Sequence, residues 1–265
     1  MNTNCETCPV HNLDNLVKLG VDMDGFDYVV ALAGNPNTGK STIFNNLTGL
    51  RQHTGNWPGK TVSRAEGGFK FSDNKFKLVD LPGTYSLLST STDEEVARNF
   101  ILFGQPDVTI IVVDSTKLER NLNLVLQILE ITDRAVLSLN LIDEAERKKI
   151  KINVRELSKQ LGIPVVPTAA RTKVGMEELL KYVHQVATGE YICKPHRIES
   201  YSKKMNNTIK ELSNELKNVF PDLTNERWVA LRLLEGDQTI IDSVRNGEVG
   251  NISVGSSNLI SEAQL

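Results

Sequence analysis

The stretch GNPNTGKS, residues 34–41, constrains the fold of this chain more than any other part of its sequence. It fits the pattern G-x-x-x-x-G-K-[ST], and it lies between the apolar run YVVALA and a segment with helical periodicity. Glycines in such a loop let the backbone curl, so that successive N–H groups and the start of the following helix face phosphate oxygens. The stretch therefore predicts a phosphate-binding loop between a strand and a helix.

The residue types in this loop predict how the phosphates of a nucleotide are held. Lys40 is expected to neutralise the β- and γ-phosphates, and the hydroxyl of Ser41 is expected to bind Mg²⁺. A glycine-rich turn without a ligand is the less favoured alternative. The other residues of the loop that we expect to contact the nucleotide are Gly34, Asn35, Asn37, Thr38, Gly39 and Thr42.

From residue 28 onward, short β-branched runs alternate with longer segments of helical periodicity. This alternation predicts an α/β fold with a doubly wound, mostly parallel sheet of six to seven strands and helices on both faces. The turn signal Ser72, Asp73 and Asn74 adds one antiparallel hairpin. The strands are expected at 28–33, 67–71, 75–80, 108–114, 135–140 and 164–168. The helices are expected to begin near residues 40, 93, 121, 153 and 175.

The pattern changes after residue 197, where strand signals end and helical periodicity continues. We predict helices at 200–220, at 225–235 with Thr224 as the N-cap, and at 238–245. The sequence therefore predicts a small all-helical domain after the α/β domain.

These patterns divide the chain into three regions. Residues 1–26 are interpreted as an N-terminal extension that is disordered, residues 27–190 as the nucleotide-binding domain, and residues 191–265 as the helical domain with a flexible C-terminal tail.

Composition narrows the class of protein. With 40% hydrophobic residues and a net charge of -3, the chain can bury a core and gives no electrostatic reason to expect nucleic acid. No apolar run approaches the ~18 residues that cross a bilayer, and the start lacks a secretory signal, so we expect a soluble, intracellular chain. Three cysteines are too few for a disulfide framework.

The N-terminal stretch CETCPVH spaces Cys5, Cys8 and His11 as metal ligands can be spaced. A zinc site needs four ligands, and no matching pair lies nearby. We favour a mobile tail over a metal site here.

Two further motifs indicate which nucleotide is bound. DLPG, residues 80–83, and NLID, residues 140–143, both end strands, at the edge of an open α/β sheet where ligands bind. The carboxylate of Asp143 can accept from the N1–H and the amine of guanine, a donor pair that adenine lacks, while Asn140 can tie this loop to the phosphate loop. A capped strand-to-helix turn is the alternative. These motifs predict GTP rather than ATP.

A weaker signal for guanine follows the last strand. The segment TAA comprises Thr168, Ala169 and Ala170, and we expect all three to line the nucleotide site. The backbone N–H of Ala169 is predicted to donate to O6 of guanine.

Together with GNWPGKTV and DLPGTYSL, these motifs resemble those of a Ras-like P-loop GTPase, and more closely the N-terminal cytosolic part of the bacterial ferrous iron transport protein B family. The resemblance covers residues 28–189, and the helical domain takes the place of that family's dissociation-inhibitor domain. It implies a cytoplasmic GTPase portion of a larger membrane protein, whose transmembrane domain carries Fe²⁺. Self-association is left open, and no nucleic acid partner is expected.

The resemblance also implies two switches. Residues 51–62 form the first, in which Thr61 gives Mg²⁺ its hydroxyl and the γ-phosphate its N–H. In the second, Asp80 reaches Mg²⁺ through water and the N–H of Gly83 donates to the γ-phosphate. Trp57 and His53 are read as partner contacts or packing anchors, not as catalytic residues.

In many Ras-like proteins a glutamine directly after the D-x-x-G motif orients the attacking water. This chain has Thr84 at that position, after DLPG. The resemblance assigns K⁺ binding to Asn37, and with Lys40, Thr61 and Gly83 it implies slow, potassium-stimulated hydrolysis. A turn-forming role is the alternative for Asn37. Leu141 stands where many GTPases have lysine, which predicts weaker binding and faster release of GDP.

Two other functions remain as alternatives. One is a GTPase of the RNA-modification or ribosome-assembly kind, which usually carries a basic appendage that this chain lacks. The other is a nucleotide switch with negligible turnover.

Overall fold

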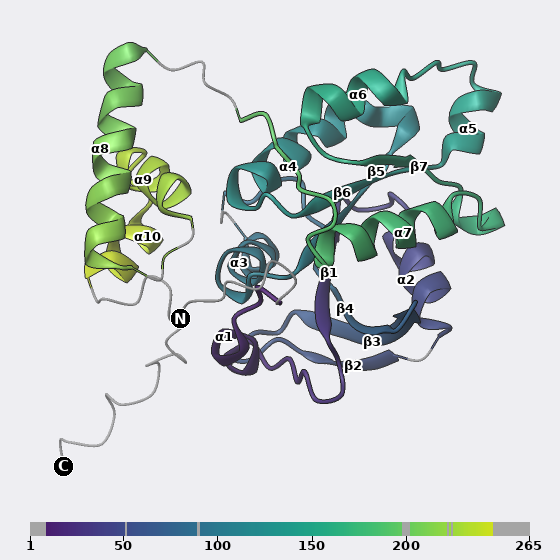
Figure 1. Cartoon of the computed structure of the whole chain (residues 1–265), viewed down its shortest axis with the longest axis horizontal. Coiled ribbons are helices and arrows are strands. Elements are labelled where there is room, and N and C mark those ends of the chain that lie inside the picture. Colours follow the sequence, from purple (N-terminus) through teal and green to yellow (C-terminus); the bar gives the residue numbers. More distant parts are fainter. Residues whose placement is uncertain are drawn as a thin grey trace.

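The computed structural model describes residues 9–50, 52–88, 91–197, 202–221, 223 and 225–245. The predictions made for Cys5, Cys8, Thr224 and the tail from residue 246 lie outside these residues. Figure 1 shows a larger α/β body and a smaller group of three helices beside it.

The larger body is built on one seven-stranded sheet in the order β2-β3-β4-β1-β5-β6-β7. The pairs β2–β3 and β3–β4 are antiparallel and the other pairs are parallel. The predicted mostly parallel sheet and the hairpin at Ser72 and Asp73 are confirmed, and the antiparallel pair β2–β3 is an addition that was not predicted. The strands are β1 (Tyr28–Gly34), β2 (Gln52–Asn56), β3 (Ser63–Phe71), β4 (Asn74–Asp80), β5 (Val108–Asp114), β6 (Ala135–Asn140) and β7 (Val165–Pro167).

The helices of this body lie on both faces of the sheet (Figure 1). They are α2 (Lys40–Thr48), α3 (Thr92–Asn99), α4 (Leu118–Ile131), α5 (Ile142–Arg147), α6 (Val154–Leu161) and α7 (Met176–Ala187). Four of the five predicted starting points agree within one residue, and α4 begins three residues before the predicted position 121. The short helix α5 was not predicted, because six residues give too little periodicity.

The core lies around the central strands β1, β5 and β6, in which every residue is buried. Strands that are covered by helices on both faces read as continuous apolar runs, which is why these three were predictable. Because the carboxyl ends of parallel strands share one edge of the sheet, this core fixes the relative positions of Gly34, Asp114 and Asn140.

The N-terminal extension differs from its prediction. Asn12 caps helix α1 (Leu13–Lys18), and Leu16 within it is fully buried. The helix packs on a π-helical turn, η1 (Phe100–Gly104), where the N–H of Asn12 donates to the carbonyl of Gly104 at 3.1 Å. The prediction of a disordered extension is therefore wrong for residues 9–26.

The first switch also differs from its prediction as a polar loop, because residues 52–56 form the edge strand β2. Gly55 and its polar neighbours give no apolar alternation. Their pairing with β3 depends on backbone hydrogen bonds, which no side-chain pattern announces.

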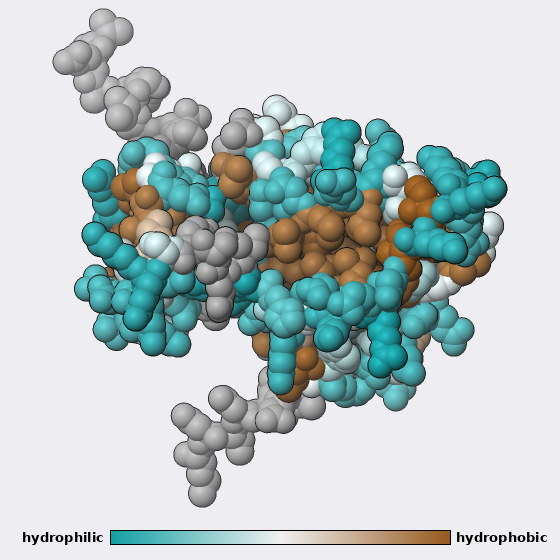
Figure 2. Space-filling model, turned by 90° about the horizontal axis from the view of Figure 1, so that it is seen from above, coloured by the Kyte–Doolittle hydropathy of each residue, from teal (hydrophilic) through white to brown (hydrophobic). Residues whose placement is uncertain are grey.

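The smaller body consists of α8 (Lys203–Val219), α9 (Glu226–Leu234) and α10 (Gln238–Arg245), as the sequence predicts. It joins the larger body through the amide of Asn225, which donates to the carbonyl of Leu102 at 3.3 Å. Seen from above, the larger body gathers apolar residues in the middle of one face between polar rims (Figure 2). Among the described helices, none is both long and apolar enough to cross a bilayer.

Candidate nucleotide-binding site

The phosphate loop connects the end of β1 to the start of α2. Gly39 precedes the helix with a φ of +85°, and a Cβ atom at this position would lie 2.3 Å from Nδ2 of Asn140. Glycine is therefore required here both for the backbone conformation and for the close approach of the neighbouring loop. Thr38 is buried, and its Oγ1 donates to the carbonyl of Asn35 at 2.9 Å, which fixes the curl of the loop.

Two loop residues predicted to contact nucleotide have opposite environments. Asn35 is 2% exposed, and neither the oxygen nor the nitrogen of its side-chain amide has a hydrogen-bond partner among the described residues. Asn37 is exposed and has a φ of 64°. Ser41 and Thr42 are exposed at the first turn of α2.

The structure brings together Lys40 and Asp80, the residues predicted for phosphate and for Mg²⁺. The ammonium of Lys40 pairs with the carboxylate of Asp80 and donates to the carbonyl of Leu81 at 2.7 Å. Burial raises the pKa of Asp80, and the charge of Lys40 opposes this shift. A polyphosphate entering the loop would compete with Asp80 for this ammonium.

The donor set around the loop fits Mg²⁺, which prefers hard oxygen ligands. Ser41 is exposed and follows Lys40 at the start of α2, and the carboxylate that pairs with Lys40 is that of Asp80 at the end of β4. Thr61 is not part of this group. It is exposed, and its side chain makes no hydrogen bond to any residue that the structure describes.

Asn140 joins the two halves of the site. Its Nδ2 donates to the carbonyl of Thr38 at 2.8 Å, which confirms the predicted tie to the phosphate loop. Its Oδ1 accepts from the N–H of Ala170 at 3.1 Å and from Oγ1 of Thr168 at 3.3 Å. Because Asn140 is 1% exposed, these bonds are shielded from water.

Asp143 lies in the first turn of α5 and is partly exposed. Within the described ranges its carboxylate makes no hydrogen bond or ion pair, so both oxygens are free to accept from a ligand. Leu141, at a φ of 60°, turns the chain into the helix, and its carbonyl accepts from Oγ of Ser115 at 2.8 Å.

The expected role of Ala169 is not supported. Its backbone N–H donates to the carbonyl of Val174 at 3.1 Å, within an isolated bridge between these two residues. The bridge closes the turn after β7, and the N–H is therefore not free to donate to guanine. Sequence gave no signal for this bridge, because it joins two residues across an irregular loop.

The second switch is held against the phosphate loop at Gly83. A Cβ atom there would lie 3.4 Å from the backbone of Pro36. Thr84, which occupies the position of the usual glutamine, is 5% exposed.

Helix α4 contributes contacts to this switch that sequence reasoning missed. Gln127 accepts from the N–H of Leu87 at 2.6 Å, and the guanidinium of Arg120 lies 4.7 Å from the centroid of the Tyr85 ring. Neither residue belongs to a recognisable motif, so only their helical spacing could have suggested a shared face.

In the first switch, Trp57 is a packing anchor. It is 2% exposed, and its ring meets that of Phe100 edge-on at a centroid distance of 5.5 Å. His53 is exposed on β2. The structure thus decides between the two readings for Trp57 and supports no catalytic role for it.

Of the three candidate metal ligands in the N-terminal motif, the structure describes only His11. Nδ1 of His11 lies 2.7 Å from the fully buried carboxylate of Asp107, so His11 is engaged. In the part of the chain that is described, no cluster of histidine, cysteine and acidic residues is arranged to hold a metal.

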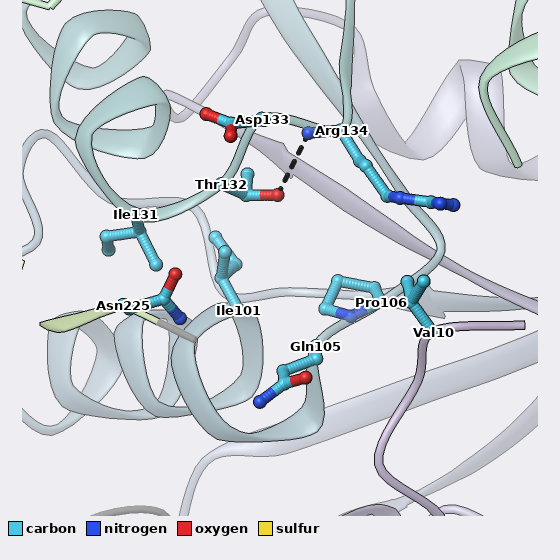
Figure 3. Close-up of a pocket in the computed structure, with 9 residues that line it drawn as sticks. All are labelled: Val10, Ile101, Gln105, Pro106, Ile131, Thr132, Asp133, Arg134 and Asn225. Carbon is cyan, nitrogen blue, oxygen red and sulfur yellow. Dashed lines mark hydrogen bonds between the residues drawn. The ribbon is translucent and has the colours of Figure 1, made fainter. Parts of the chain in front are cut away.

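A separate cavity of about 180 Å³ lies at the opposite end of the sheet, before β5 and β6 (Figure 3). Val10, Pro106 and Asn225 contribute to its lining, so it lies where the extension, the sheet and the helical body meet. Arg134 turns away from it, and its guanidinium donates to the carbonyl of Ala187 at 3.3 Å. No nucleotide motif reaches this cavity.

Comparison with known proteins gives a consistent result. The family model for ferrous iron transport protein B matches residues 28–183, and that for the FeoB cytosolic helical domain matches residues 201–262. The Fe(2+) transporter FeoB of Escherichia coli strain K12 is 42% identical over 212 residues. These residues are 78% of this chain and 27% of the transporter, so the chain spans about a quarter of the curated relatives it matches.

Solved structures agree. The cytosolic domain of T. maritima FeoB in a GDP form is 39% identical, with a TM-score of 0.75 over 88% of this chain and 89% of that one. The GMPPNP form of the same domain gives the same identity and TM-score, over 88% and 90%. The cytosolic domain of L. pneumophila FeoB is 32% identical, with a TM-score of 0.74 over 85% and 90%. The chain therefore belongs to the ferrous iron transport protein B (FeoB) family.

Proposed function

We propose that this chain is the GTP-binding and slowly GTP-hydrolysing regulatory part of a bacterial ferrous iron transporter. The single observation that carries the proposal is the position of Asn140, which holds the phosphate loop and the guanine loop together through Thr38 and Ala170. One ligand can therefore contact Lys40 at one end and Asp143 at the other. Family membership favours this function over an RNA-modification or ribosome-assembly GTPase.

Residues of both switches complete the site. Ser41, Asp80 and Thr61 would hold Mg²⁺, which neutralises charge on the β- and γ-phosphates. Thr61 is exposed near the end of the first switch, and a rearrangement of that switch would bring it to the site. Gly83 itself already lies beside the phosphate loop, against Pro36.

Potassium stimulation is the finer part of the proposal. The transition state needs positive charge near the bridge between the β- and γ-phosphates, and the described switches place no arginine there. Asn37 offers an exposed amide without a hydrogen bond among the described residues, at the outer side of the loop. A K⁺ ion held by Asn37 and by carbonyls of the first switch would supply this charge.

This part is tested by measuring GTP turnover in KCl and in NaCl at equal ionic strength. Because Asn37 has a φ of 64°, Asn37→Gly removes the amide without straining the backbone, whereas alanine would add strain. We expect KCl to stimulate the wild type and not Asn37→Gly. Equal rates in both salts, or full stimulation of the variant, would remove the proposal.

Single-turnover release of phosphate separates an enzyme from a switch with negligible turnover. We expect complete conversion of bound GTP, at a slow rate, since Thr84 cannot orient water as a glutamine does. We also expect fast release of GDP, because Leu141 replaces the lysine that stacks on the base in many GTPases. Stopped-flow displacement of a fluorescent GDP analogue measures this rate, and nanomolar affinity would contradict it.

The helical body is proposed to relay the state of the switches to a transmembrane domain in the full-length protein, with this part on the cytoplasmic side. Arg98, at the end of α3, supports this role. It is 1% exposed, pairs with Asp237 at 3.6 Å and lies 5.9 Å from the centroid of the Trp228 ring. A buried guanidinium that joins α3 to α9 and to Asp237, the residue before α10, offers a direct coupling between the two bodies.

A further inference from the structure

The N-terminal extension touches the first switch directly. Gly20 has a φ of +78°, and a Cβ atom built on it would lie 2.3 Å from Nη1 of Arg64 and 3.0 Å from Cγ of Pro58. Pro58 belongs to the first switch, and Arg64 is the second residue of β3, just after it. Gly20 precedes residues 28–183, which the family model matches, whereas Pro58 and Arg64 lie within them.

Arg64 is held from three sides. Its Nη1 donates to the carbonyl of Leu19 at 2.7 Å, and its Nε forms an ion pair with Glu66 at 2.7 Å. Its guanidinium lies 5.5 Å from the centroid of the Trp57 ring. A planar, forked cation can make these three contacts at once, which the single head group of lysine cannot.

Trp57 in turn fixes the end of the first switch. Its backbone N–H donates to the carbonyl of Val62 at 2.9 Å, and its carbonyl accepts from the N–H of Lys60 at 3.0 Å. The short turn that these bonds close contains Thr61. Trp57 is buried against Phe100, while Thr61 in the same turn is exposed.

We propose that Arg64 is a positioning residue through which the N-terminal extension holds the first switch. The turn at Leu19 and Gly20 supports Arg64, Arg64 holds Trp57, and Trp57 keeps residues 52–56 paired as β2. This contact retards the rearrangement that would bring Thr61 to the phosphate loop. The inference rests on the proposed function, since it concerns the switch that senses the γ-phosphate.

Two glycines of the extension provide a matched test. Gly20 and Gly25 have φ values of +78° and +75°, so alanine strains the backbone equally at both. At Gly25 no atom lies within 4 Å of the added Cβ, whereas at Gly20 the Cβ displaces Arg64 and meets Pro58. Only Gly20→Ala therefore disturbs the contact with the switch.

The readout is the fluorescence of Trp57. The chain has two tryptophans, so replacing Trp228 by phenylalanine leaves Trp57 as the only reporter. Stopped-flow mixing with GMPPNP and Mg²⁺ then follows the departure of Trp57 from its buried position. We expect the change to be roughly five- to tenfold faster in Gly20→Ala and in Arg64→Ala than in the parent or in Gly25→Ala, as loss of a cation–π contact and a hydrogen bond implies.

Arg64→Lys retains the charge over the ring but loses the simultaneous bond to Leu19, so an intermediate rate is expected. If Arg64→Ala does not fold, Gly20→Ala and Arg64→Lys carry the test. Equal rates for Gly20→Ala and Gly25→Ala would overturn the proposal. So would a fast Gly20→Ala combined with an Arg64 variant that behaves as the parent, because the effect would then pass through Pro58 alone.

Affinity for GMPPNP, measured by calorimetry on the same proteins, separates this inference from the proposed function. If the parent does not bind the analogue, the proposed function fails. If it binds while the Trp57 rates do not differ between the two glycine variants, the function stands and the role of Arg64 is refuted.

Discussion

The substitution Asn140→Ala tests whether the two halves of the site act as one. It removes the bond from Nδ2 to Thr38 and the two bonds that Oδ1 accepts from Ala170 and Thr168. Each bond contributes about 0.5–1.5 kcal/mol net, so we expect a loss of about 2–4 kcal/mol in the free energy of unfolding. The upper part of this range is favoured because the carbonyl of Thr38 and the N–H of Ala170 lose a buried partner.

Nucleotide affinity should fall as well, because the loops that hold the phosphates and the base lose their alignment. If about half of that loss, about 1–2 kcal/mol, is expressed in binding, the dissociation constant for GDP rises roughly 5- to 30-fold. Urea unfolding gives the first quantity, and calorimetry with GDP at a temperature at which the unfolding curve shows the variant to be folded gives the second.

Ser138→Ala is the matched control. Ser138 is also fully buried on β6, and its hydroxyl bonds Oγ1 of Thr168 at 2.8 Å without touching the phosphate loop. It should lose about 1 kcal/mol of stability and keep its affinity for GDP. If Asn140→Ala loses stability but binds GDP as well as Ser138→Ala does, the tie between the loops has no role in binding.

Three further predictions follow from other parts of the fold. Gly162→Ala would place a Cβ atom 1.8 Å from the carbonyl oxygen of Lys194, so we expect the free energy of unfolding in urea to fall by more than about 3 kcal/mol. In the control Gly49→Ala, φ is also positive but the space is open, and a loss of about 1 kcal/mol is expected. Similar losses in the two variants would refute the steric argument. Burial raises the pKa of the Cys193 thiol to about 11. In a variant whose two N-terminal cysteines are replaced by serine, a thiol reagent at pH 8 should therefore label Cys193 only after the chain is unfolded. Rapid labelling of the folded chain would contradict this. Burial also raises the pKa of Asp80 above its ordinary 3.8. At pH values between 3.8 and the raised pKa, the folded chain keeps a proton that the unfolded chain has lost, so the stability of the wild type relative to Asp80→Asn should fall as the pH rises through this range. A stability difference that does not depend on pH would show that the pKa is not raised.

The parts of the fold that sequence predicts well are those in which one local pattern decides the structure. β5 and β6 were predicted to the residue because each is a buried apolar run between polar turns. The phosphate loop was predictable because Gly39 must adopt a positive φ and admit Asn140 closely, and few residue types satisfy both demands.

The parts that sequence missed depend on contacts between distant segments. The order of the extension comes from Asp107, whose carboxylate accepts from the N–H groups of Val10 and Val29 and contacts His11. The pairing of β2 depends on backbone bonds along a polar, glycine-containing stretch. The bridge from Ala169 to Val174 likewise joins residues that no periodicity relates. In each case the deciding interaction is tertiary and leaves no regular pattern of side chains.

Calorimetric titration of the chain with GDP and with ADP, both with Mg²⁺, tests the central claim most directly. If the amides of residues 34–41 hold the phosphates and Asp143 accepts two hydrogen bonds from the base, ADP should bind at least about 100-fold more weakly than GDP, since bonds to a charged group contribute about 1.5–3 kcal/mol each. Asp143→Ala should remove most of this difference. Equal affinities for the two nucleotides in the wild type would contradict the account.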